Sequence, residues 1–269
     1  MQVGVSTASL FMRKNNEAAL PLLNDLGVKY AEVFLTSFSE YGYPFADTLK
    51  SVKGDLNVYS VHALNTEFEP QLFSKHPRVK ADAYGWAEKV LESAVALGAN
   101  YYTFHGASRV KRASRSGEND DFPSMIAGFR ELSEFCENRG VSLCLENVEW
   151  STYNRPGVFR ILADEIPKLC GVLDIKQARI SEHPWGVYLD EMGDRLSHVH
   201  ISDVDERGKM CLPGQGRFPF EELVKRLIDV DFNGAILIEV YNKDYKEYAE
   251  LKNSVDFIDE IFYKYGCQK

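Results

Sequence analysis

The chain has 269 residues, of which 45% are hydrophobic, and its formal net charge is −9. This length is enough for a sizeable core in one or two domains. The acidic balance argues against general affinity for nucleic acid or for an anionic membrane surface. No apolar run approaches the ~18 residues that are needed to span a bilayer.

The cysteines and the N-terminal segment indicate the compartment. The five cysteines form no CxxC pair, and Cys144 and Cys170 lie inside apolar strand-like runs. We therefore interpret both as small core hydrophobes in a reducing compartment. The N-terminal segment lacks a basic region followed by a long apolar stretch, so we expect a cytoplasmic protein.

One phrase recurs along the chain: a helix-like segment, a glycine and a short apolar run. Glycine suits the C′ position, at which an α-helix ends and the chain turns toward a strand. A βα unit takes ~30 residues or slightly more, so the first and last intervals between these glycines each hold two units. The glycines are Gly27, Gly98, Gly140, Gly171 and Gly234.

In chain order, this rhythm predicts eight strands, near residues 2–6, 29–35, 57–62, 100–105, 141–147, 171–174, 196–201 and 235–240. Amphipathic helical stretches with apolar residues at spacings of three and four lie between them. Since no linker interrupts the alternation, we predict a single (β/α)₈ TIM barrel, one domain over residues 1–269. A doubly wound open sheet would normally carry a glycine-rich phosphate loop after its first strand, and STASLFMRKN contains no glycine.

Side chains that can bind metals accompany seven of the predicted strands. In a TIM barrel the strand ends meet at one face, where the active site lies. Several carboxylates gathered there without a cation would repel one another, and a divalent metal is the simplest compensation. Mixed oxygen and imidazole ligands suit Mn²⁺, Mg²⁺, Co²⁺ or Zn²⁺. The residues are Glu32, His62, His105, Glu146, Asp174, His198, His200 and Glu239.

The stretch LSHVHISDVDERG, residues 196–208, contains two of these histidines. Side chains alternate along a strand, so His198 and His200 point to the same side. If that side is the pore, His200 lies nearer the mouth and is the ligand, while His198 lies one layer deeper. Asp203 either orients His200 through a hydrogen bond or caps the following loop, and the sequence leaves both possibilities open.

The set Glu146, Asp174, His200 and Glu239 resembles the metal quartet of the xylose isomerase-like TIM barrels. HVHISD followed by LPGQGRFPF resembles the strand-seven signature of that superfamily and the Gly-rich turn behind it. The similarity extends over essentially the whole chain. The superfamily includes sugar epimerases, sugar-phosphate isomerases, inosose dehydratases and the endonuclease IV group, so the resemblance implies a divalent metal held by these four residues.

The chain departs from the endonuclease IV group at the third metal of that group. His62 and His105 match ligands of an additional metal there, bridged through Glu146. The third metal, however, takes a His and a DxH pair at positions where this chain has Gln177, Gly208 and Met210. None of these three is a good ligand, so we expect no cleavage of abasic DNA and no nucleic-acid partner.

The chain also departs from the ketose 3-epimerases of the superfamily. These enzymes have a His where Gln177 stands and an Arg shortly after the strand-seven His. Arg207 is a candidate for that Arg, offset by one position. His62 and His105 are not usual epimerase ligands, and we expect them to bind substrate hydroxyls or a second metal.

Loops after the strands add further candidates. Trp150 and Trp185, which follow strands five and six, are candidate walls against a sugar ring, whereas Trp86 falls in a predicted helix and is expected in the core. The loop after strand four either holds a substrate phosphate or is simply solvated. Its basic residues are Arg109, Lys111, Arg112 and Arg115.

These observations predict a divalent-metal-dependent isomerase or epimerase that acts on a sugar or sugar phosphate by proton transfer through an enediolate. Glu146 and Glu239 end strands three apart around the ring, so they approach the centre from well-separated directions and suit an acid–base pair. The expected substrate-binding residues are His62, His105, Gln177, Arg207, Trp150 and Trp185.

Three other functions stay open at this point: an inosose-type dehydratase, a metal-dependent hydrolase of a small phosphodiester, and a non-catalytic barrel that binds a sugar or a metal. The sequence does not identify the substrate, the metal or the oligomeric state, and a homo-oligomer is compatible with it. We expect a small-molecule partner and no membrane.

Overall fold

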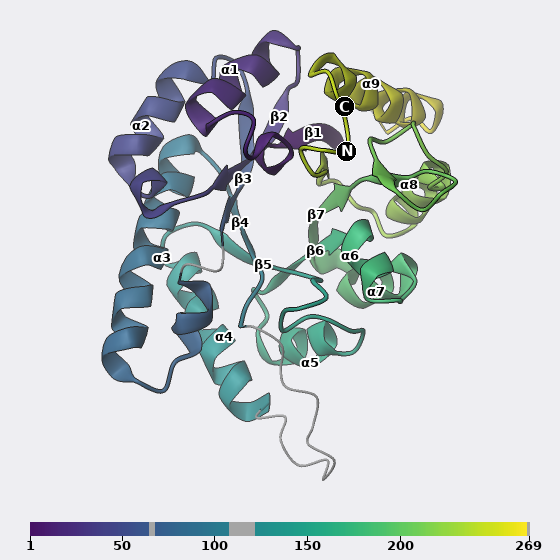
Figure 1. Cartoon of the computed structure of the whole chain (residues 1–269). Helices are drawn as coiled ribbons and strands as arrows, with labels where there is room; N and C mark the ends of the chain where they lie inside the picture. Colours follow the sequence, from purple (N-terminus) through teal and green to yellow (C-terminus); the bar gives the residue numbers. More distant parts are fainter. Residues whose placement is uncertain (65–67, 108–121, 268–269) are drawn as a thin grey trace.

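The computed structural model describes residues 1–64, 68–107 and 122–267, and its eight long strands form one closed parallel barrel (Figure 1). Around the barrel the order is β1-β10-β7-β6-β5-β4-β3-β2, which confirms the predicted TIM barrel. The strands are β1 Gln2–Ser6, β2 Tyr30–Leu35, β3 Asn57–Ala63, β4 Tyr101–Phe104, β5 Ser142–Glu146, β6 Cys170–Asp174, β7 Leu196–Ile201 and β10 Ala235–Ile238.

Helices surround the barrel (Figure 1). They are α1 Asn16–Asp25, α2 Tyr43–Val52, α3 Pro77–Leu97, α4 Phe122–Glu137, α5 Val158–Glu165, α6 Ile175–Ile180, α7 Trp185–Met192, α8 Phe220–Asp229 and α9 Ala249–Lys264. Four 3₁₀ turns also occur: η1 Thr7–Leu10, η2 Phe38–Glu40, η3 Glu69–Phe73 and η4 Gly193–Arg195. A short hairpin of β8 (Asp203–Val204) and β9 (Met210–Cys211) follows β7.

The helices form because their apolar residues fall on one face. In α8 the buried residues are Phe220, Leu223, Val224 and Leu227, a spacing that places them on a single stripe. The first turn of α8 carries Glu221 and Glu222, whose charges suit the positive end of the helix dipole. This stripe packs inward and leaves the charged face of the helix in solvent.

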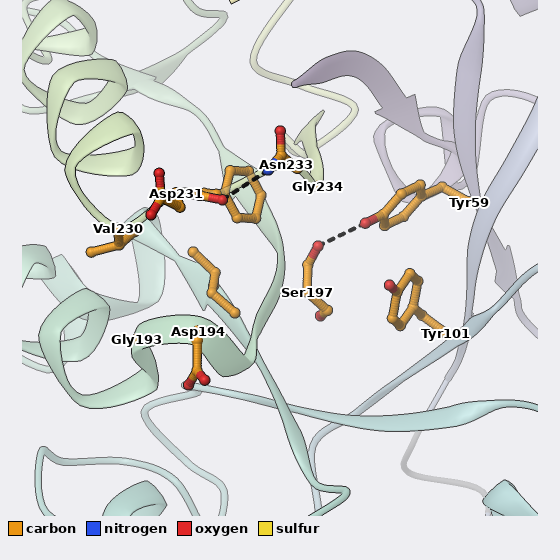
Figure 2. A pocket seen from close by; sticks show the side chains of 11 residues that line it. Tyr59, Tyr101, Gly193, Asp194, Ser197, Val230, Asp231, Asn233 and Gly234 are labelled. Carbon is orange, nitrogen blue, oxygen red and sulfur yellow. Dashed lines mark hydrogen bonds between the residues drawn. The ribbon is translucent and has the colours of Figure 1, made fainter.

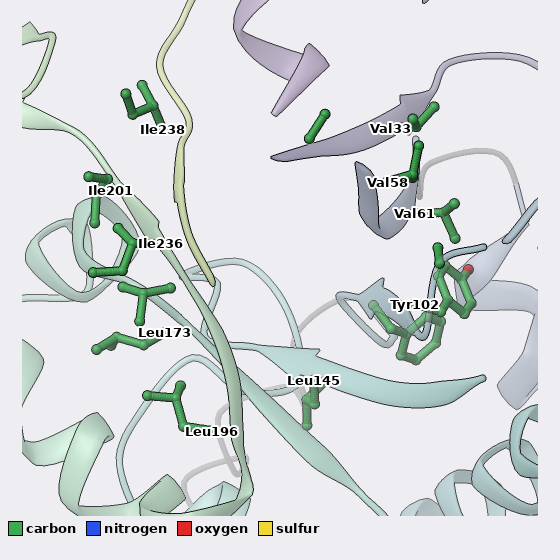
Figure 3. Close-up of a cluster of buried hydrophobic side chains, with 14 of the residues drawn as sticks. Val33, Val58, Val61, Tyr102, Leu145, Leu173, Leu196, Ile201, Ile236 and Ile238 are labelled. Atoms are coloured by element: carbon green, nitrogen blue, oxygen red, sulfur yellow. The ribbon is translucent and has the colours of Figure 1, made fainter. Parts of the chain in front are cut away.

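The hydrophobic core lies between the barrel and the helices. Val33, Val61, Leu145, Leu173 and Ile236 belong to it, and Figure 3 shows them on the strands of the barrel wall. Full burial of such a side chain contributes roughly 1.5–3 kcal/mol. Since side chains alternate along a strand, the neighbours of these residues point into the barrel, and many of those neighbours are polar.

Left-handed backbone, with φ between 75° and 77°, occurs at three of the glycines predicted to end helices: Gly27, Gly98 and Gly140. The prediction is wrong for the other two. Gly171 lies within β6, where an added Cβ would be 2.7 Å from Cγ of Met192. Gly234 precedes β10, and a Cβ there would overlap the carbonyl oxygen of Ser197. Both glycines therefore permit close packing, and Asp231, with a φ of 54°, adopts the left-handed conformation after α8.

The structure also tests the predicted burial of Trp86 and of two cysteines. Trp86 on α3 is half-buried, packs against the core and lies with its ring centroid 4.2 Å from that of Phe38. Cys144 is fully buried on β5, while its register partner on β6, Cys170, is only half-buried. Within the described ranges, no helix combines the length and the apolar character needed to cross a membrane.

A cavity of about 360 Å³ lies at the amino-terminal ends of the strands (Figure 2). Tyr59 and Tyr101 line it with their rings stacked, 5.0 Å between centroids, and the Tyr59 hydroxyl donates to the carbonyl oxygen of Ser197 at 2.7 Å. In TIM barrels the loops that carry catalytic residues lie at the opposite, carboxyl-terminal face. The candidate functional residues are therefore at the other end of the barrel from this cavity.

Gly4 provides a test of the close contact between β1 and β2. A Cβ at this position would overlap the carbonyl oxygen of Tyr30, its register partner on β2. We expect Gly4→Ala to lower the free energy of unfolding by about 2 kcal/mol, because the strand backbones must move apart. Gly85 on α3 is the matched control, since no described atom lies within 4 Å of its added Cβ.

Gly85→Ala should raise the free energy of unfolding by about 0.5–1 kcal/mol, since alanine favours a helix interior. Urea denaturation measures both variants. Similar shifts in both would show that the contact with Tyr30 is not the cause.

Candidate metal centre and active site

Four side chains converge at the carboxyl-terminal end of the barrel. Glu146 and Asp174 end β5 and β6, His200 lies on β7, and Glu239 directly follows β10. Each offers one ligand atom, and these atoms all lie within 4.8 Å of one another. The structure thus brings together the four residues that the sequence indicated as a metal quartet.

Glu146 contacts two imidazoles at once. Its Oε1 lies 2.9 Å from Nδ1 of His200, and its Oε2 lies 2.7 Å from Nε2 of His105. Burial alone would raise the pKa of this carboxyl. The charge of His200 and the hydrogen bonds from both imidazoles outweigh it and hold the pKa well below the usual range. Glu146 is therefore an ionised carboxylate in a buried position.

His200 is surrounded by carboxylates. Its Nδ1 also lies 3.3 Å from Oε2 of Glu239, while its Nε2 lies 3.1 Å from Oε1 of Glu32. Burial disfavours the imidazolium, but the charges of Glu239, Glu32 and Glu146 raise the pKa of His200 well above its usual value. Nδ1 thus faces the quartet, and Nε2 faces the interior of the barrel.

Glu32 is the carboxylate beneath the quartet, and the sequence did not single it out from the other strand residues. It is fully buried on β2, and hydroxyl groups from three strands hold it. Against the effect of burial, the charge of His200 and hydrogen bonds from histidines lower its pKa well below the usual range. Its hydroxyl donors, at 3.0, 2.8 and 2.6 Å, are Ser6, Ser60 and Thr103.

Two local arrangements fix Asp174. Its Oδ1 caps α6 by accepting from the backbone N–H groups of Lys176 and Gln177, at 2.7 and 3.0 Å. Its peptide is clamped by the Asn147 amide, which accepts from the Asp174 N–H at 2.7 Å and donates to the Asp174 carbonyl at 2.9 Å. Burial raises the pKa of Asp174 to about 6, opposed by the charge of Lys176.

Lys176 is a residue of the candidate site that sequence reasoning missed. Its side chain is 4% exposed, and its Nζ lies 3.5 Å from both Oδ2 of Asp174 and Oε1 of Glu239. Burial opposes its charge, but the two carboxylates raise the pKa of Lys176 above its usual value. The only signal in the sequence was its place two residues after an aspartate that ends a strand.

His62 and His105 form a second group beside the quartet. Their Nε2 atoms are 3.1 Å apart, and together with Glu146 they offer three possible ligand atoms within 4.8 Å of one another. The ring of Trp150 meets His105 edge-on at 5.3 Å between centroids, and Trp150 is 37% exposed. These three side chains therefore line the approach to Glu146.

The remaining predicted site residues are Gln177, Arg207 and Trp185. The Oε1 of Gln177 accepts from the backbone N–H of Glu149 at 3.4 Å. Arg207 is exposed in the turn of the β8–β9 hairpin. Trp185 at the start of α7 packs on Phe218, with ring centroids 6.0 Å apart. The predicted basic loop, with Arg109, Lys111, Arg112 and Arg115, lies outside the described residues.

The two possibilities for Asp203 are now distinguished. Its carboxylate accepts from four backbone N–H groups of the following segment, at 2.7 to 3.1 Å, so it caps that loop. The donors are Val204, Gly214, Gly216 and Phe218. His198 lies deeper than His200, as the alternation predicted: it is fully buried, and its Nε2 is 2.9 Å from the Thr103 hydroxyl.

Arg179 contacts two of the positions that hold the third metal in the endonuclease IV group. Its guanidinium donates to the carbonyl oxygen of Gly208 at 3.2 Å and lies 3.6 Å from the sulfur of Met210. A cationic side chain at this place opposes metal binding there, in agreement with the poor ligands that the sequence has at these positions.

The quartet suits a divalent cation on its own chemistry. Among the described residues, Oε2 of Glu239 is a buried carboxylate oxygen without a hydrogen-bond partner, and it lies 3.3 Å from Nδ1 of His200. Three carboxylates and an imidazole are a donor set that Mn²⁺, Co²⁺, Zn²⁺ and Mg²⁺ accept. The carboxylates that raise the pKa of His200 would equally attract a metal ion, which competes with the proton for Nδ1.

A buried carboxyl next to the site provides a test by pH. Glu69 on η3 accepts from the Tyr102 hydroxyl at 2.5 Å and from the backbone N–H of His105 at 3.4 Å. Burial raises its pKa from 4.5 to about 7. Between these pH values the unfolded chain loses this proton and the folded protein keeps it, so stability falls as pH rises, by about 3 kcal/mol in total.

Glu69→Gln cannot ionise, so it should not lose this stability as pH rises. From pH 5 to pH 8, its free energy of unfolding should therefore rise by about 2–3 kcal/mol relative to that of the wild type. Urea denaturation with a chelator present measures this difference. Glu260→Gln on the exposed face of α9 is the control and should show no such gain. Parallel pH profiles of the wild type and Glu69→Gln would contradict the raised pKa.

Comparisons with known proteins agree with this fold. Fructoselysine 3-epimerase of Escherichia coli O157:H7 is 33% identical over 118 residues, which are 41% of this chain and 42% of that enzyme, so the match spans less than half of the relative. The structure of D-psicose 3-epimerase with D-tagatose from Clostridium cellulolyticum H10 superimposes with a TM-score of 0.77 at 18% identity and covers 100% of both chains.

The structure of the IOLI protein with a bound zinc atom superimposes with a TM-score of 0.77 at 16% identity, and it covers 98% of this chain and 99% of that one. The family model described as a xylose isomerase-like TIM barrel matches residues 20–261. The chain therefore belongs to the family of xylose isomerase-like TIM barrels.

Proposed function

We propose that the protein is a divalent-metal-dependent epimerase that inverts a carbon next to the carbonyl group of a ketose or ketose phosphate. The observation that carries this proposal is the placement of Glu146 and Glu239 at the two ends of a run of four adjacent strands, with Asp174 and His200 between them. Family membership and the 3-epimerases among the relatives support it.

The quartet Glu146, Asp174, His200 and Glu239 would hold the metal. A bound divalent cation supplies Lewis acidity that polarises the carbonyl and hydroxyl oxygens of the substrate. The protein then has to remove a proton from one face of the carbon and return one to the other face. Two carboxyl groups that approach from opposite sides do this directly, through an enediolate of the substrate.

Glu146 suits the role of the base because its low pKa keeps it ionised despite burial. Glu239 faces it across the quartet and would return the proton to the other face. His62, His105 and Gln177 would hold substrate hydroxyls, and Trp150 would pack against the sugar. Arg207 and Trp185 are not included in this site, because their contacts lie with the hairpin turn and with Phe218.

Solvent exchange tests the assignment of the two glutamates. Protein purified without chelator is first assayed for metal, then screened against ketoses, their phosphates and inososes. Turnover of the converted sugar in D₂O should place deuterium at the inverted carbon. Glu146→Gln and Glu239→Gln should each lower this incorporation by at least about 10²-fold, the scale of a lost general base, and Glu206→Gln in the exposed hairpin turn should leave it unchanged.

Full deuterium exchange by both variants would show that water, and not these residues, carries the proton. Inversion without any solvent label, under single-base or hydride-transfer kinetics, would show that the assignment of the two glutamates is wrong. Loss of water from an inosose, or hydrolysis of a small phosphodiester, would instead establish one of the alternative activities.

The carboxylate beneath the quartet gives a second test. Glu32 lies 3.1 Å from the far nitrogen of His200, so it should orient the imidazole toward the metal. We expect Glu32→Gln to weaken Mn²⁺ binding by about 10–100-fold in titration calorimetry. Glu69→Gln, a change at another fully buried glutamate that has no contact with His200, is the matched control and should retain wild-type affinity. Equal affinity of Glu32→Gln and the wild type would remove Glu32 from this role.

A further inference from the structure

Lys176 places a positive charge beside two of the four proposed ligands. We propose that Lys176 is a positioning residue that balances the charge of the centre, so that it weakens metal binding and at the same time favours the anionic intermediate of the reaction. This inference rests on the proposed function, because it concerns the same metal centre.

The geometry indicates an interaction through charge. The Nζ atom lies 3.5 Å from one oxygen of Asp174 and 3.5 Å from one oxygen of Glu239. These distances exceed those of ordinary N–H···O hydrogen bonds, which are about 2.7–3.2 Å. The ammonium therefore attracts both carboxylates without taking either one out of the quartet.

The position of Lys176 is well determined by its surroundings. Its backbone N–H donates to Oδ1 of Asp174 at 2.7 Å, which places the residue in the first turn of α6 directly at the strand end. Its side chain is 4% exposed, and its Nζ lies 4.9 Å from the ring centroid of Tyr241. Because the side chain is held from three directions, its charge acts at a fixed place.

The sum of charges at the centre explains the effect of Lys176. Glu146, Asp174 and Glu239 carry three negative charges, a divalent metal adds two positive charges, and Lys176 adds the third. The group formed by the four ligands, the metal and Lys176 is then neutral, with Glu32 beneath His200 outside this sum. Without Lys176 it would carry one negative charge, which attracts the metal more strongly and repels an enediolate. Since these charges lie in a poorly solvated place, one unit of charge changes either equilibrium by about tenfold or more.

A purely structural role of Lys176 would give a different result for metal affinity. If Lys176 only tied α6 to the barrel, its removal would loosen Asp174, and metal affinity and turnover would fall together. Charge balance predicts opposite signs: metal affinity rises while turnover falls. The two readings are therefore separable in one variant.

Lys176→Met keeps the length and volume of the side chain and removes its charge. We expect it to bind Mn²⁺ at least tenfold more tightly in titration calorimetry, and to turn over the sugar that the wild type converts at least tenfold more slowly. Lys176→Arg keeps the charge and should restore wild-type metal affinity to within about threefold. Lys225→Met is the matched control, since Lys225 is an exposed lysine of α8 whose Nζ lies 5.3 Å from the ring centroid of Tyr265.

Lys225→Met removes the same charge from the chain and should alter neither quantity. Unchanged or weaker Mn²⁺ binding by folded Lys176→Met would overturn the inference about Lys176. If the wild type binds Mn²⁺ in the same experiment, the proposed function stays intact. No metal binding by the wild type would refute the proposed function itself. If Lys176→Met does not fold, as judged by circular dichroism, Lys176→Gln is measured in its place with the same expected signs.

Discussion

The mutual compensation of buried charges at the carboxyl-terminal end of the barrel is the interaction on which the site depends. Glu32, Glu146 and Asp174 are almost completely buried, and such carboxylates would be too costly without partners. Their partners within the described chain include His200, which contacts Glu32 and Glu146, and Lys176, which contacts Asp174. Each carboxylate therefore keeps its place because a cationic group of another element lies beside it.

The barrel makes this compensation possible through its register. Asp174 on β6 is paired with His200 on β7, and His200 is paired in turn with Leu237 on β10, two residues before Glu239. The side chains that alternate with these positions, such as Leu173 and Val199, are fully buried in the core beneath the helices. One strand thus serves both the core and the site, because its two faces meet different surroundings.

The fold could be predicted from the sequence because its signals are local. Periodic apolar residues recur along the chain, and Gly27, Gly98 and Gly140 mark helix ends, so the alternation of strands and helices is visible without knowledge of any distant contact. The failures at Gly171 and Gly234 have the opposite origin. There the glycine is required by close approach to Met192 and to the backbone of β7, and such contacts between elements are not encoded in the local pattern.

The convergence of the candidate site residues was predictable to the same degree. Strand-ending residues such as Glu146 and Glu239 were found, since the strand ends of a barrel meet at one face. The partners that determine their charge were not found. The sequence presents Glu32 only as one of several strand residues, and the structure shows its position under His200. Lys176 occurs in a helix turn, where a lysine is ordinarily solvated, and its burial depends on how α6 packs against the strand ends.

These unpredicted partners suggest how one barrel framework can support different reactions. A metal quartet alone holds a cation and polarises an oxygen, which many reactions need. What distinguishes a proton-transfer site is the charge that remains after the metal is bound, because it sets the cost of an anionic intermediate. In the proposed centre of this chain, that charge would be set by residues just outside the quartet: Lys176 beside it, and His62 and His105 across from it. Residues at such positions can change without disturbing the strands, so the chemistry can vary while the barrel and its four ligands stay the same.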